Sequence, residues 1–320
     1  MAKVLILGKI EAAGIDLLLE QGRIDVRELP DHSPDIMQQV GDADAIVVRM
    51  TRIDSRLIDA APSLKVVARH GVGYEAVDVA ALTARGIPLA LVGDVNSGAV
   101  AEHTLAMMLA VSKRIVVHDR ALRDGRFDVR DRFAATELAD KTVLIVGFGR
   151  IGRRVALHCT AFEMDVYVHD PFFGIDEVRP FGYKYSPILQ DALEIADYVC
   201  LHVPKSAETV NLIGKPELAS MKPTATLINV SRGGIVDEAA LFDALSQGRL
   251  ASAALDVFEP EPPLTDNPLL SLDSVVLSPH CAAFTRECGR RMSVACARNV
   301  LAAFDGSLDP ALVVNPETLG

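Results

Sequence analysis

Short apolar runs alternate with amphipathic segments from residue 1 to about residue 92. Four runs have the length of a strand, and they cover residues 4–7, 45–48, 65–68 and 88–91. Three segments between them carry apolar side chains at helical spacing, and they cover residues 15–20, 55–61 and 77–85. Continuously apolar strands separated by helices are typical of a parallel sheet that is covered on both faces. This part of the chain therefore predicts an α/β domain.

A second alternating series starts at residue 142. Its strand-like runs cover residues 142–146, 165–169, 198–203, 225–230, 251–256 and 274–277. Six such runs with helices between them match the doubly wound dinucleotide fold. A last helix is predicted over residues 285–304, followed by a short tail, and we expect no regulatory domain after it.

Residues 97–115 join the two series and predict one long helix. This helix is apolar on nearly every face through Leu105-Ala-Met-Met-Leu-Ala-Val111. A helix that is hydrophobic all round must be buried. Burial inside the monomer and burial by a second subunit are both open at this point. Residues 118–140 are strongly charged and predict a solvated connector.

Composition restricts the class of protein. The length of 320 residues favours two domains. The net charge of −11, without a basic block, argues against nucleic-acid binding and against docking on anionic lipid. No apolar stretch is long enough to predict a membrane span or a signal peptide. Five cysteines without a CxxC pair predict free thiols, no metal site and a cytoplasmic location.

A glycine-rich loop follows the strand at residues 142–146 and precedes a predicted helix. It reads Gly147-Phe-Gly149-Arg-Ile-Gly152, and the next strand delivers Asp170 at 18 residues past the last glycine. Together these features form the dinucleotide-binding fingerprint, in which the helix N-terminus faces the pyrophosphate. Asp170 is expected to accept hydrogen bonds from the adenosine ribose. Because a 2′-phosphate would face this carboxylate, NAD is favoured over NADP.

Three polar residues follow successive predicted strands of the second series: Arg232, Glu261 and His280. Ligands of open α/β sheets bind at the carboxyl ends of the strands. An arginine binds a carboxylate bidentately and polarises a carbonyl. A histidine moves a proton near neutral pH, and a neighbouring acid favours its protonated form. The set predicts hydride transfer between NAD and a 2-hydroxy acid.

Several motifs along the chain resemble those of one family, the D-isomer-specific 2-hydroxyacid dehydrogenases, which include D-3-phosphoglycerate dehydrogenase. They are His70-Gly-Val-Gly-Tyr74, Ala101-Glu-His103, the Gly147–Gly152 loop, Asn229-Val-Ser-Arg-Gly-Gly234, Leu255-Asp-Val-Phe-Glu-Pro-Glu261 and Ser278-Pro-His280. The resemblance covers nearly the whole chain. It implies two Rossmann-like or flavodoxin-like domains with doubly wound parallel sheets. The substrate domain, residues 1–98 and 287–320, would be split by an NAD-binding domain, residues 99–286.

The resemblance also implies roles for particular residues. Arg232, Glu261 and His280 match the catalytic set, and Asp256 matches the acid that holds the nicotinamide carboxamide. Positions that match the cofactor site, besides the three glycines, Asp170 and Asp256, are Thr104, Arg150, Ile151, His202, Val203, Pro204, Thr209, Val230, Ser231, Ala282 and Ala283. Val72 and Gly73 match the loop that binds the substrate carboxylate through backbone N–H groups. A homodimer joined through the helix after Asn96 is implied as well.

The substrate is less defined than the reaction. Arg49 and Arg69 match arginines that bind phosphate in relatives acting on 3-phosphoglycerate, and they can equally be surface arginines at strand ends. Hydroxypyruvate, glyoxylate and larger 2-oxo acids are alternatives, and an NAD-sensing corepressor-like protein is an alternative of a different class. Glu261 argues against the similar formate dehydrogenases, which have an amide there. Glu75-Ala76 and Cys281 depart from the family pattern.

Overall fold

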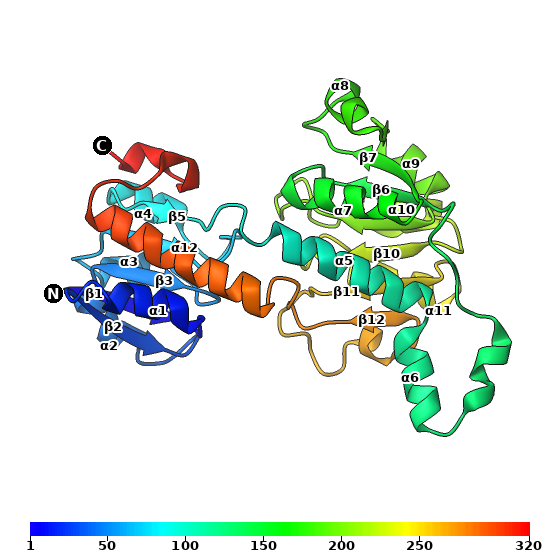
Figure 1. The fold of residues 1–320 in the computed structure, drawn as a ribbon, viewed down its shortest axis with the longest axis horizontal. Coiled ribbons are helices and arrows are strands. Elements are labelled where there is room, and N and C mark those ends of the chain that lie inside the picture. Colours follow the sequence, from blue (N-terminus) through cyan, green and yellow to red (C-terminus); the bar gives the residue numbers. More distant parts are fainter. The chain divides into compact units, whose positions relative to one another are not determined.

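The computed structural model describes residues 1–320 and divides into two compact units. Unit 1 combines Met1–Asn96 with Phe284–Gly320, and unit 2 is Ser97–Ala283. The boundaries expected from the sequence, after residues 98 and 286, lie two and three residues further along the chain. The chain thus leaves unit 1 once and returns to it for its last segment (Figure 1).

Unit 1 is built on a five-stranded parallel sheet with the order β2-β1-β3-β4-β5. Its strands are β1 (Ala2–Leu7), β2 (Ile24–Leu29), β3 (Ala45–Val48), β4 (Val66–Arg69) and β5 (Leu89–Ala90). Its helices are α1 (Ala12–Leu19), α2 (Ile36–Gln39), α3 (Ser55–Asp59), α4 (Val79–Ala84) and α12 (Arg286–Phe304), with 3-10 turns η1 (Val40–Asp42), η5 (Pro310–Leu312) and η6 (Pro316–Thr318). The helix α12 packs on α1, where Gly14 has no room for a side chain because a Cβ would lie 2.5 Å from the carbonyl oxygen of Ser293.

The edge strand β2 is missing from the sequence-based prediction. Its sequence, Ile-Asp-Val-Arg-Glu-Leu, carries three charged residues, so it lacks the apolar run of its neighbours. It pairs only with β1, and charged side chains are common on such edge strands. The sheet therefore has one strand more than its apolar runs indicate.

Unit 2 is built on a seven-stranded parallel sheet with the order β12-β11-β10-β9-β6-β7-β8. Its strands are β6 (Thr142–Val146), β7 (Asp165–His169), β8 (Lys184–Tyr185), β9 (Tyr198–Leu201), β10 (Thr226–Asn229), β11 (Ser252–Leu255) and β12 (Val275–Leu277). Its helices are α5 (Ser97–Ser112), α6 (Ile115–Arg123), α7 (Arg150–Ala161), α8 (Ile175–Val178), α9 (Leu189–Ile195), α10 (Lys215–Ser220) and α11 (Glu238–Ser246), with 3-10 turns η2 (Phe127–Arg132), η3 (Arg179–Phe181) and η4 (Pro268–Ser271).

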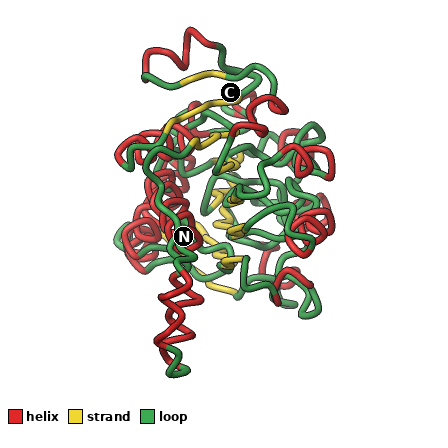
Figure 2. Tube along the Cα trace, turned by 90° about the vertical axis from the view of Figure 1, so that its right-hand side faces the viewer, coloured by secondary structure: helices red, strands yellow, loops and turns green.

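The strand order of unit 2 reverses direction at β6. Strand β7 lies on one side of β6 and β9 on the other, which creates a crevice at their carboxyl ends. Helices cover both faces of the strands (Figure 2). The predicted fold class, two doubly wound parallel α/β domains, is confirmed, and all six predicted strands of the second series are present.

The apolar helix after Asn96 differs from its prediction. It ends at Ser112, Arg114 adopts a left-handed conformation with φ 51°, and α6 begins at Ile115. Much of its apolar surface, including Leu105 and Met108, is buried against α7 and β11 of the same unit. The apolar character of α5 is thus largely explained within one chain. No helix of the structure is both long and apolar enough to span a bilayer.

The charged segment after α5 is not an irregular connector. It forms α6 and η2, which extend away from the sheet of unit 2 as an arm (Figure 1). Two aromatic side chains of this arm are solvent-exposed, Phe127 at 62% and Phe133 at 91%. Exposed aromatic side chains of this size point to an interaction surface when they gather on one segment.

Candidate active site

The glycine-rich loop joins β6 to α7 at the crevice of unit 2. Gly147 has φ +97°, and Gly152 lies so close to it that a Cβ would be 2.0 Å from the Gly147 carbonyl oxygen. Gly149 is the N-cap of α7, and a Cβ there would meet no atom within 4 Å. Two glycines thus close the turn, and the third leaves open space at the helix N-terminus, where an anion is stabilised. Arg150 is exposed and Ile151 is partly buried in the first turn of α7.

Asp170 follows the last residue of β7 and is buried. Its Oδ2 accepts a hydrogen bond from the N–H of Phe148 at 2.7 Å, and its Oδ1 accepts one from the N–H of Phe172 at 2.8 Å. The carboxylate therefore holds the glycine-rich loop and the loop after β7 together. Each oxygen keeps a further lone pair for a hydroxyl donor.

His202, Val203 and Pro204 follow β9 at the same edge of the sheet. Both ring nitrogens of His202 are buried without a hydrogen-bond partner, and burial lowers the pKa of His202 to about 3. The ring is therefore neutral. Thr209 stabilises the turn after Pro204, because its hydroxyl donates to the Pro204 carbonyl oxygen at 2.6 Å.

The structure does not bring every predicted cofactor residue to an accessible position. Thr104 is fully buried in α5, and its hydroxyl donates to the Val100 carbonyl oxygen at 2.8 Å. Val230 and Ser231 directly follow β10 and are buried, and the Ser231 hydroxyl donates to the carbonyl oxygen of Leu201. These side chains are therefore buried beneath the crevice, and they pack against the residues that form its edge.

Arg232 lies in the loop after β10. Asn229 folds this loop, because its Oδ1 accepts from the N–H of Ser231 and its Nδ2 donates to the carbonyl oxygen of Arg232, both at 3.0 Å. The next residue, Gly233, is tightly packed, since a Cβ would lie 1.7 Å from the Phe258 carbonyl oxygen. A glycine is needed there for the Arg232 loop to approach the loop that carries Glu261.

Glu261 and His280 form a hydrogen-bonded pair. His280 Nδ1 lies 2.7 Å from Glu261 Oε2, and the other oxygen, Oε1, accepts the N–H of Phe258 at 3.0 Å. Burial raises the pKa of Glu261, but the hydrogen bond and charge of His280, the Phe258 N–H and the Arg232 charge outweigh burial and lower it. Glu261 is therefore an ionised partner for the imidazole. The side chain of His280 is 37% exposed, so its ring can still meet a ligand.

Asp256 follows β11 and is fully buried. Its Oδ1 accepts from the Ser278 hydroxyl at 2.5 Å and from the Cys281 N–H at 2.9 Å, and its Oδ2 accepts from the Ala282 N–H at 3.0 Å. Burial raises the pKa of Asp256, whereas the hydrogen bonds from His103, Ser278 and these two N–H groups lower it. Ala282 is buried and Ala283 partly buried directly after this contact.

The remaining predicted residues belong to unit 1. Arg49 and Arg69 lie at the carboxyl ends of the adjacent strands β3 and β4. The Arg49 guanidinium lies 4.5 Å above the ring of Phe284, and Arg69 Nη1 donates to the carbonyl oxygen of His70 at 2.6 Å. Burial, followed by the charges of Arg69 and Arg49, lowers the pKa of His70 to about 4. The two arginines thus create a local positive field.

The loop after β4 begins at Gly71, which has φ +143°. A Cβ on Gly71 would lie 3.1 Å from Arg69 Nη1, so the glycine leaves room for the arginine. Val72 and Gly73 come next and are partly exposed. Their position close to Arg69 follows from their place in the sequence.

Within unit 2, three residues take part in the site without an assigned role in the sequence analysis. His103 Nε2 lies 2.9 Å from the Ser278 hydroxyl oxygen and 3.6 Å from Asp256 Oδ1, and Asn229 folds the Arg232 loop. His103 and Ser278 belong to motifs that resemble the family, but residues 175 positions apart carry no spacing signal. Only the fold brings them together.

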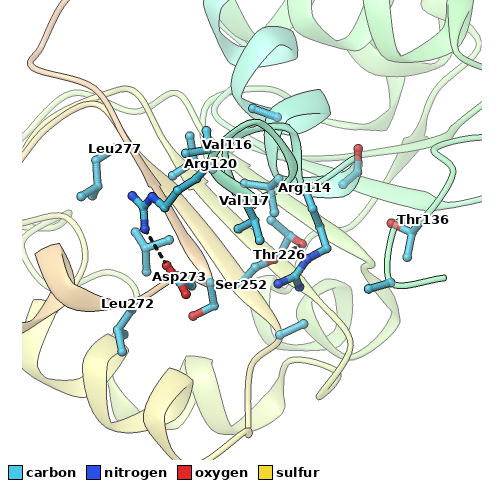
Figure 3. Close-up of a pocket in the computed structure, with 18 of the residues that line it drawn as sticks. Arg114, Val116, Val117, Arg120, Thr136, Thr226, Ser252, Leu272, Asp273 and Leu277 are labelled. Atoms are coloured by element: carbon cyan, nitrogen blue, oxygen red, sulfur yellow. Dashed lines mark hydrogen bonds and ion pairs between the residues drawn. The ribbon is translucent and has the colours of Figure 1, made fainter. Parts of the chain in front are cut away.

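A separate pocket of about 340 Å³ lies at the opposite end of the same sheet (Figure 3). It is lined by the first residues of several strands, including Thr226, Ser252 and Val275, and by Arg114 and Arg120 beyond α5. Arg120 Nη1 forms an ion pair with Asp273 Oδ1 at 3.2 Å within this lining. Because parallel strands begin at this end, the pocket is distinct from the crevice at their carboxyl ends.

Comparison with known proteins agrees with the resemblance drawn from the motifs. Residues 105–282 match the family model of the D-isomer specific 2-hydroxyacid dehydrogenase, NAD binding domain. The chain is 39% identical over 301 residues to D-3-phosphoglycerate dehydrogenase of Archaeoglobus fulgidus, covering 93% of this chain and 56% of that protein. It is 38% identical over 317 residues to glyoxylate reductase of Korarchaeum cryptofilum, covering 97% of this chain and 95% of that protein.

A solved structure shows the same fold. The TT0316 protein from Thermus thermophilus superposes with a TM-score of 0.91 at 34% identity, over 98% of this chain and 99% of that one. The chain spans little more than half of the D-3-phosphoglycerate dehydrogenase relative but nearly all of the glyoxylate reductase and of the solved structure. The family model alone covers more than half of the residues. The chain belongs to the D-isomer specific 2-hydroxyacid dehydrogenase family.

Proposed function

We propose that this protein is an NAD-dependent D-2-hydroxyacid dehydrogenase, which transfers hydride between NAD(H) and a 2-hydroxy or 2-oxo acid. The observation that carries the proposal is the pair of His280 Nδ1 and Glu261 Oε2 at 2.7 Å. The pair is joined by Arg232, whose charge acts on Glu261, and it lies in the same unit as the glycine-rich loop. Unit 2 is accordingly the NAD-binding domain, and unit 1 is the substrate domain.

The residues of the crevice fit a dinucleotide. The open space above Gly149 at the N-terminus of α7 suits the pyrophosphate. Asp170 has acceptor capacity left for the ribose hydroxyls, and its charge disfavours a 2′-phosphate, so NAD is the proposed cofactor. Asp256, at the end of β11, is the proposed acceptor for the nicotinamide carboxamide. Bound NADH supplies the hydride for the 2-carbon of the substrate.

Side chains of unit 2 carry out the remaining steps, which are substrate binding, polarisation of the carbonyl and proton transfer. Arg232 binds the substrate carboxylate and polarises the carbonyl through its planar, permanently charged guanidinium. His280 gives its proton to the carbonyl oxygen during reduction and takes it back during oxidation. Glu261 holds Nδ1, so that Nε2 is the atom that meets the substrate oxygen, and its charge stabilises the imidazolium.

Two observations favour different substrates. The paired arginines Arg49 and Arg69 suit a phosphate group, which supports 3-phosphoglycerate. The similarity to a glyoxylate reductase over 95% of its length supports glyoxylate or hydroxypyruvate. We place 3-phosphoglycerate first because Arg49 and Arg69 lie at adjacent strand ends and their charges, after burial, lower the pKa of the neighbouring His70. A bound phosphate dianion would offset that positive field.

A substrate panel followed by NADH absorbance tests both the reaction and its substrate. We expect NADH oxidation with a phosphorylated 2-oxo acid, namely 3-phosphohydroxypyruvate. Arg49→Ala should lower its kcat/KM by about tenfold, the effect of one lost charged hydrogen bond, and leave hydroxypyruvate nearly unaffected. An equal loss of kcat/KM for 3-phosphohydroxypyruvate and hydroxypyruvate would show that Arg49 has a structural role and does not bind the phosphate. NADH binding without turnover of any 2-oxo acid would favour the corepressor-like role instead.

A homodimer is the proposed assembly. The arm of α6 and η2 exposes Phe127 and Phe133, and the pocket of Figure 3 lies beside the start of that arm. A second copy of the chain would cover these aromatic side chains. Sedimentation velocity should give a dimer that the double variant Phe127→Asp and Phe133→Asp converts to a monomer. The control Leu264→Asp alters a side chain that is 60% exposed in another loop and should leave the dimer intact.

A further inference from the structure

Three side chains of different metal-ligand type meet in unit 2. They are His103 on α5, Asp256 after β11 and Cys281 after β12. One ligand atom from each, an imidazole nitrogen, a carboxylate oxygen and the thiol sulfur, lies within 4.8 Å of the other two. Because the three come from separate elements of one compact unit, the fold itself fixes their approach.

Hydrogen bonds within the cluster show how these atoms are occupied. The Ser278 hydroxyl has one proton, which it donates to Asp256 Oδ1 at 2.5 Å. His103 Nε2 must then donate to the Ser278 oxygen, 2.9 Å away. Ser278 also has the sulfur of Met107 within 3.6 Å as another acceptor. The hydroxyl can therefore turn away from Asp256, and His103 can present a lone pair at Nε2 when its proton moves to Nδ1.

We propose that His103 Nε2, the Asp256 carboxylate and the Cys281 sulfur form a binding site for a zinc-like divalent cation. Nitrogen, oxygen and thiolate sulfur are the usual ligands of Zn²⁺ in proteins, at about 2.0–2.3 Å. Ligand atoms around a tetrahedral ion lie about 3.3–3.8 Å apart. His103 Nε2 and Asp256 Oδ1 already lie 3.6 Å apart, so the cluster needs to contract by about 1 Å at most on binding. Rotation about the side-chain bonds of His103 and Cys281 provides this movement.

The charges of the cluster fit a divalent cation. Asp256 and a deprotonated Cys281 neutralise two positive charges, and His103 binds as the neutral ring. The thiol proton of Cys281 leaves to solvent as the metal–sulfur bond forms. Three protein ligands leave a fourth position for water.

The site has a consequence for the cofactor, which rests on the proposed function. Asp256 is the proposed acceptor for the nicotinamide carboxamide, and one carboxylate in a fully buried position cannot serve both partners. Metal and cofactor therefore exclude one another. Zinc should inhibit turnover competitively with NADH, and saturating NADH should protect the protein from zinc.

Cobalt is the probe for the experiment, because Co²⁺ replaces zinc and gives a thiolate charge-transfer band in the near ultraviolet. Tag-free, reduced apo protein is titrated with CoCl₂, and the wild type is compared with two matched variants. Cys281→Ser removes the proposed sulfur ligand but keeps the N–H that bonds Asp256. Cys288→Ser removes a thiol of unit 1 and keeps a donor for the Val95 carbonyl oxygen.

We expect the band in the wild type and in Cys288→Ser and not in Cys281→Ser. The affinity should fall by at least about tenfold in Cys281→Ser, since the loss of residues that merely orient a metal ligand already costs that much. A band that persists in Cys281→Ser, or no band in the wild type, overturns the metal site. NADH binding to Cys281→Ser, measured by fluorescence, checks its fold.

Competition separates the metal site from the proposed function. Loss of the cobalt band on addition of NADH supports both the metal site and the role of Asp256. A cobalt band that depends on Cys281 but resists saturating NADH supports the metal site and contradicts the carboxamide role of Asp256.

Discussion

The carboxyl ends of the two parallel sheets present different sets of charged side chains. At the ends of β3 and β4, unit 1 presents Arg49 and Arg69. Burial of His70, followed by the charges of Arg69 and Arg49, lowers the pKa of that histidine to about 4. At the ends of β7 and β11, unit 2 presents Asp170 and Asp256, each of which accepts hydrogen bonds from backbone N–H groups. Both units are built on a parallel sheet, so the residues after the strands decide which ligand groups each edge attracts.

This difference assigns ligand groups to the two edges. A cluster of arginines attracts the anionic parts of a substrate, whereas carboxylates attract hydroxyl, amide and imidazolium donors. In unit 2 the Glu261 carboxylate lies 2.7 Å from Nδ1 of His280, whereas in unit 1 burial, followed by the charges of Arg69 and Arg49, lowers the pKa of His70 to about 4.

The largest expected effect comes from removing the histidine at the acidic edge. His280→Ala should slow the turnover of keto acids by about a hundredfold to ten-thousandfold, the range of general acid–base catalysis. The affinity for NADH should change little, because the imidazole meets the substrate rather than the cofactor. Stopped-flow kinetics and fluorescence titration measure the two quantities. A fully active His280→Ala variant would remove the catalytic assignment.

The histidine at the basic edge should affect stability. Its folded pKa of about 4 lies below the unfolded value of about 6.5, so unfolding takes up a proton between these values and stability falls as pH falls. From pH 6.5 to 5 the loss is on the order of 2 kcal/mol. His70→Gln keeps a polar atom for Ser293, which lies 3.2 Å from His70 Nε2, and does not titrate.

Urea unfolding at pH 7.5 and 5.0 measures this contribution. Between these two pH values the free energy of unfolding should fall less in His70→Gln than in the wild type. The difference should be about 2 kcal/mol. The buried His202 of unit 2 titrates in both proteins and cancels in the comparison. Equal pH dependence in the two proteins would contradict a lowered pKa of His70 in the folded protein.

A smaller effect is expected on cofactor choice. Asp170→Ser removes the negative charge that disfavours a 2′-phosphate, and the ratio of kcat/KM for NADH over NADPH should fall by about tenfold or more. The variant also loses the acceptor for the N–H groups of Phe148 and Phe172. Asp170→Asn also removes the negative charge but keeps one oxygen acceptor for these N–H groups, so it separates the effect of charge from the loss of the hydrogen bonds. A wild type that uses NADPH as well as NADH contradicts this role of Asp170.

The sequence predicts much of unit 2 because its signals are local. The apolar run of β6, the glycines of the turn and the acid at the end of β7 lie within 29 residues of one another. The parallel topology then places Arg232, Glu261 and His280 at one edge, since each follows a strand of the same sheet. A local pattern and one topological rule are sufficient for this part of the site.

The rest depends on contacts that no spacing reveals. β2 is too charged to resemble its neighbours, and the arm of α6 and η2 has the composition of a solvated connector. Thr104 matches a cofactor-lining position in the sequence, yet its hydroxyl bonds within α5. The approach of His103, Asp256 and Cys281 joins three distant segments, so it becomes visible only in three dimensions.

The pH profile of reductive kcat/KM tests the proposed acid most directly. The lowered pKa of Glu261 keeps this carboxylate ionised throughout the range in which an imidazole titrates, so the alkaline limb reports loss of the proton that His280 donates. Glu261→Gln keeps a hydrogen-bonding oxygen but removes the charge that favours the imidazolium. The apparent pKa of the alkaline limb should therefore fall by about 1–3 units relative to the wild type, with a smaller loss of activity at acid pH than at alkaline pH. An alkaline limb at the same pH in both proteins would contradict the account.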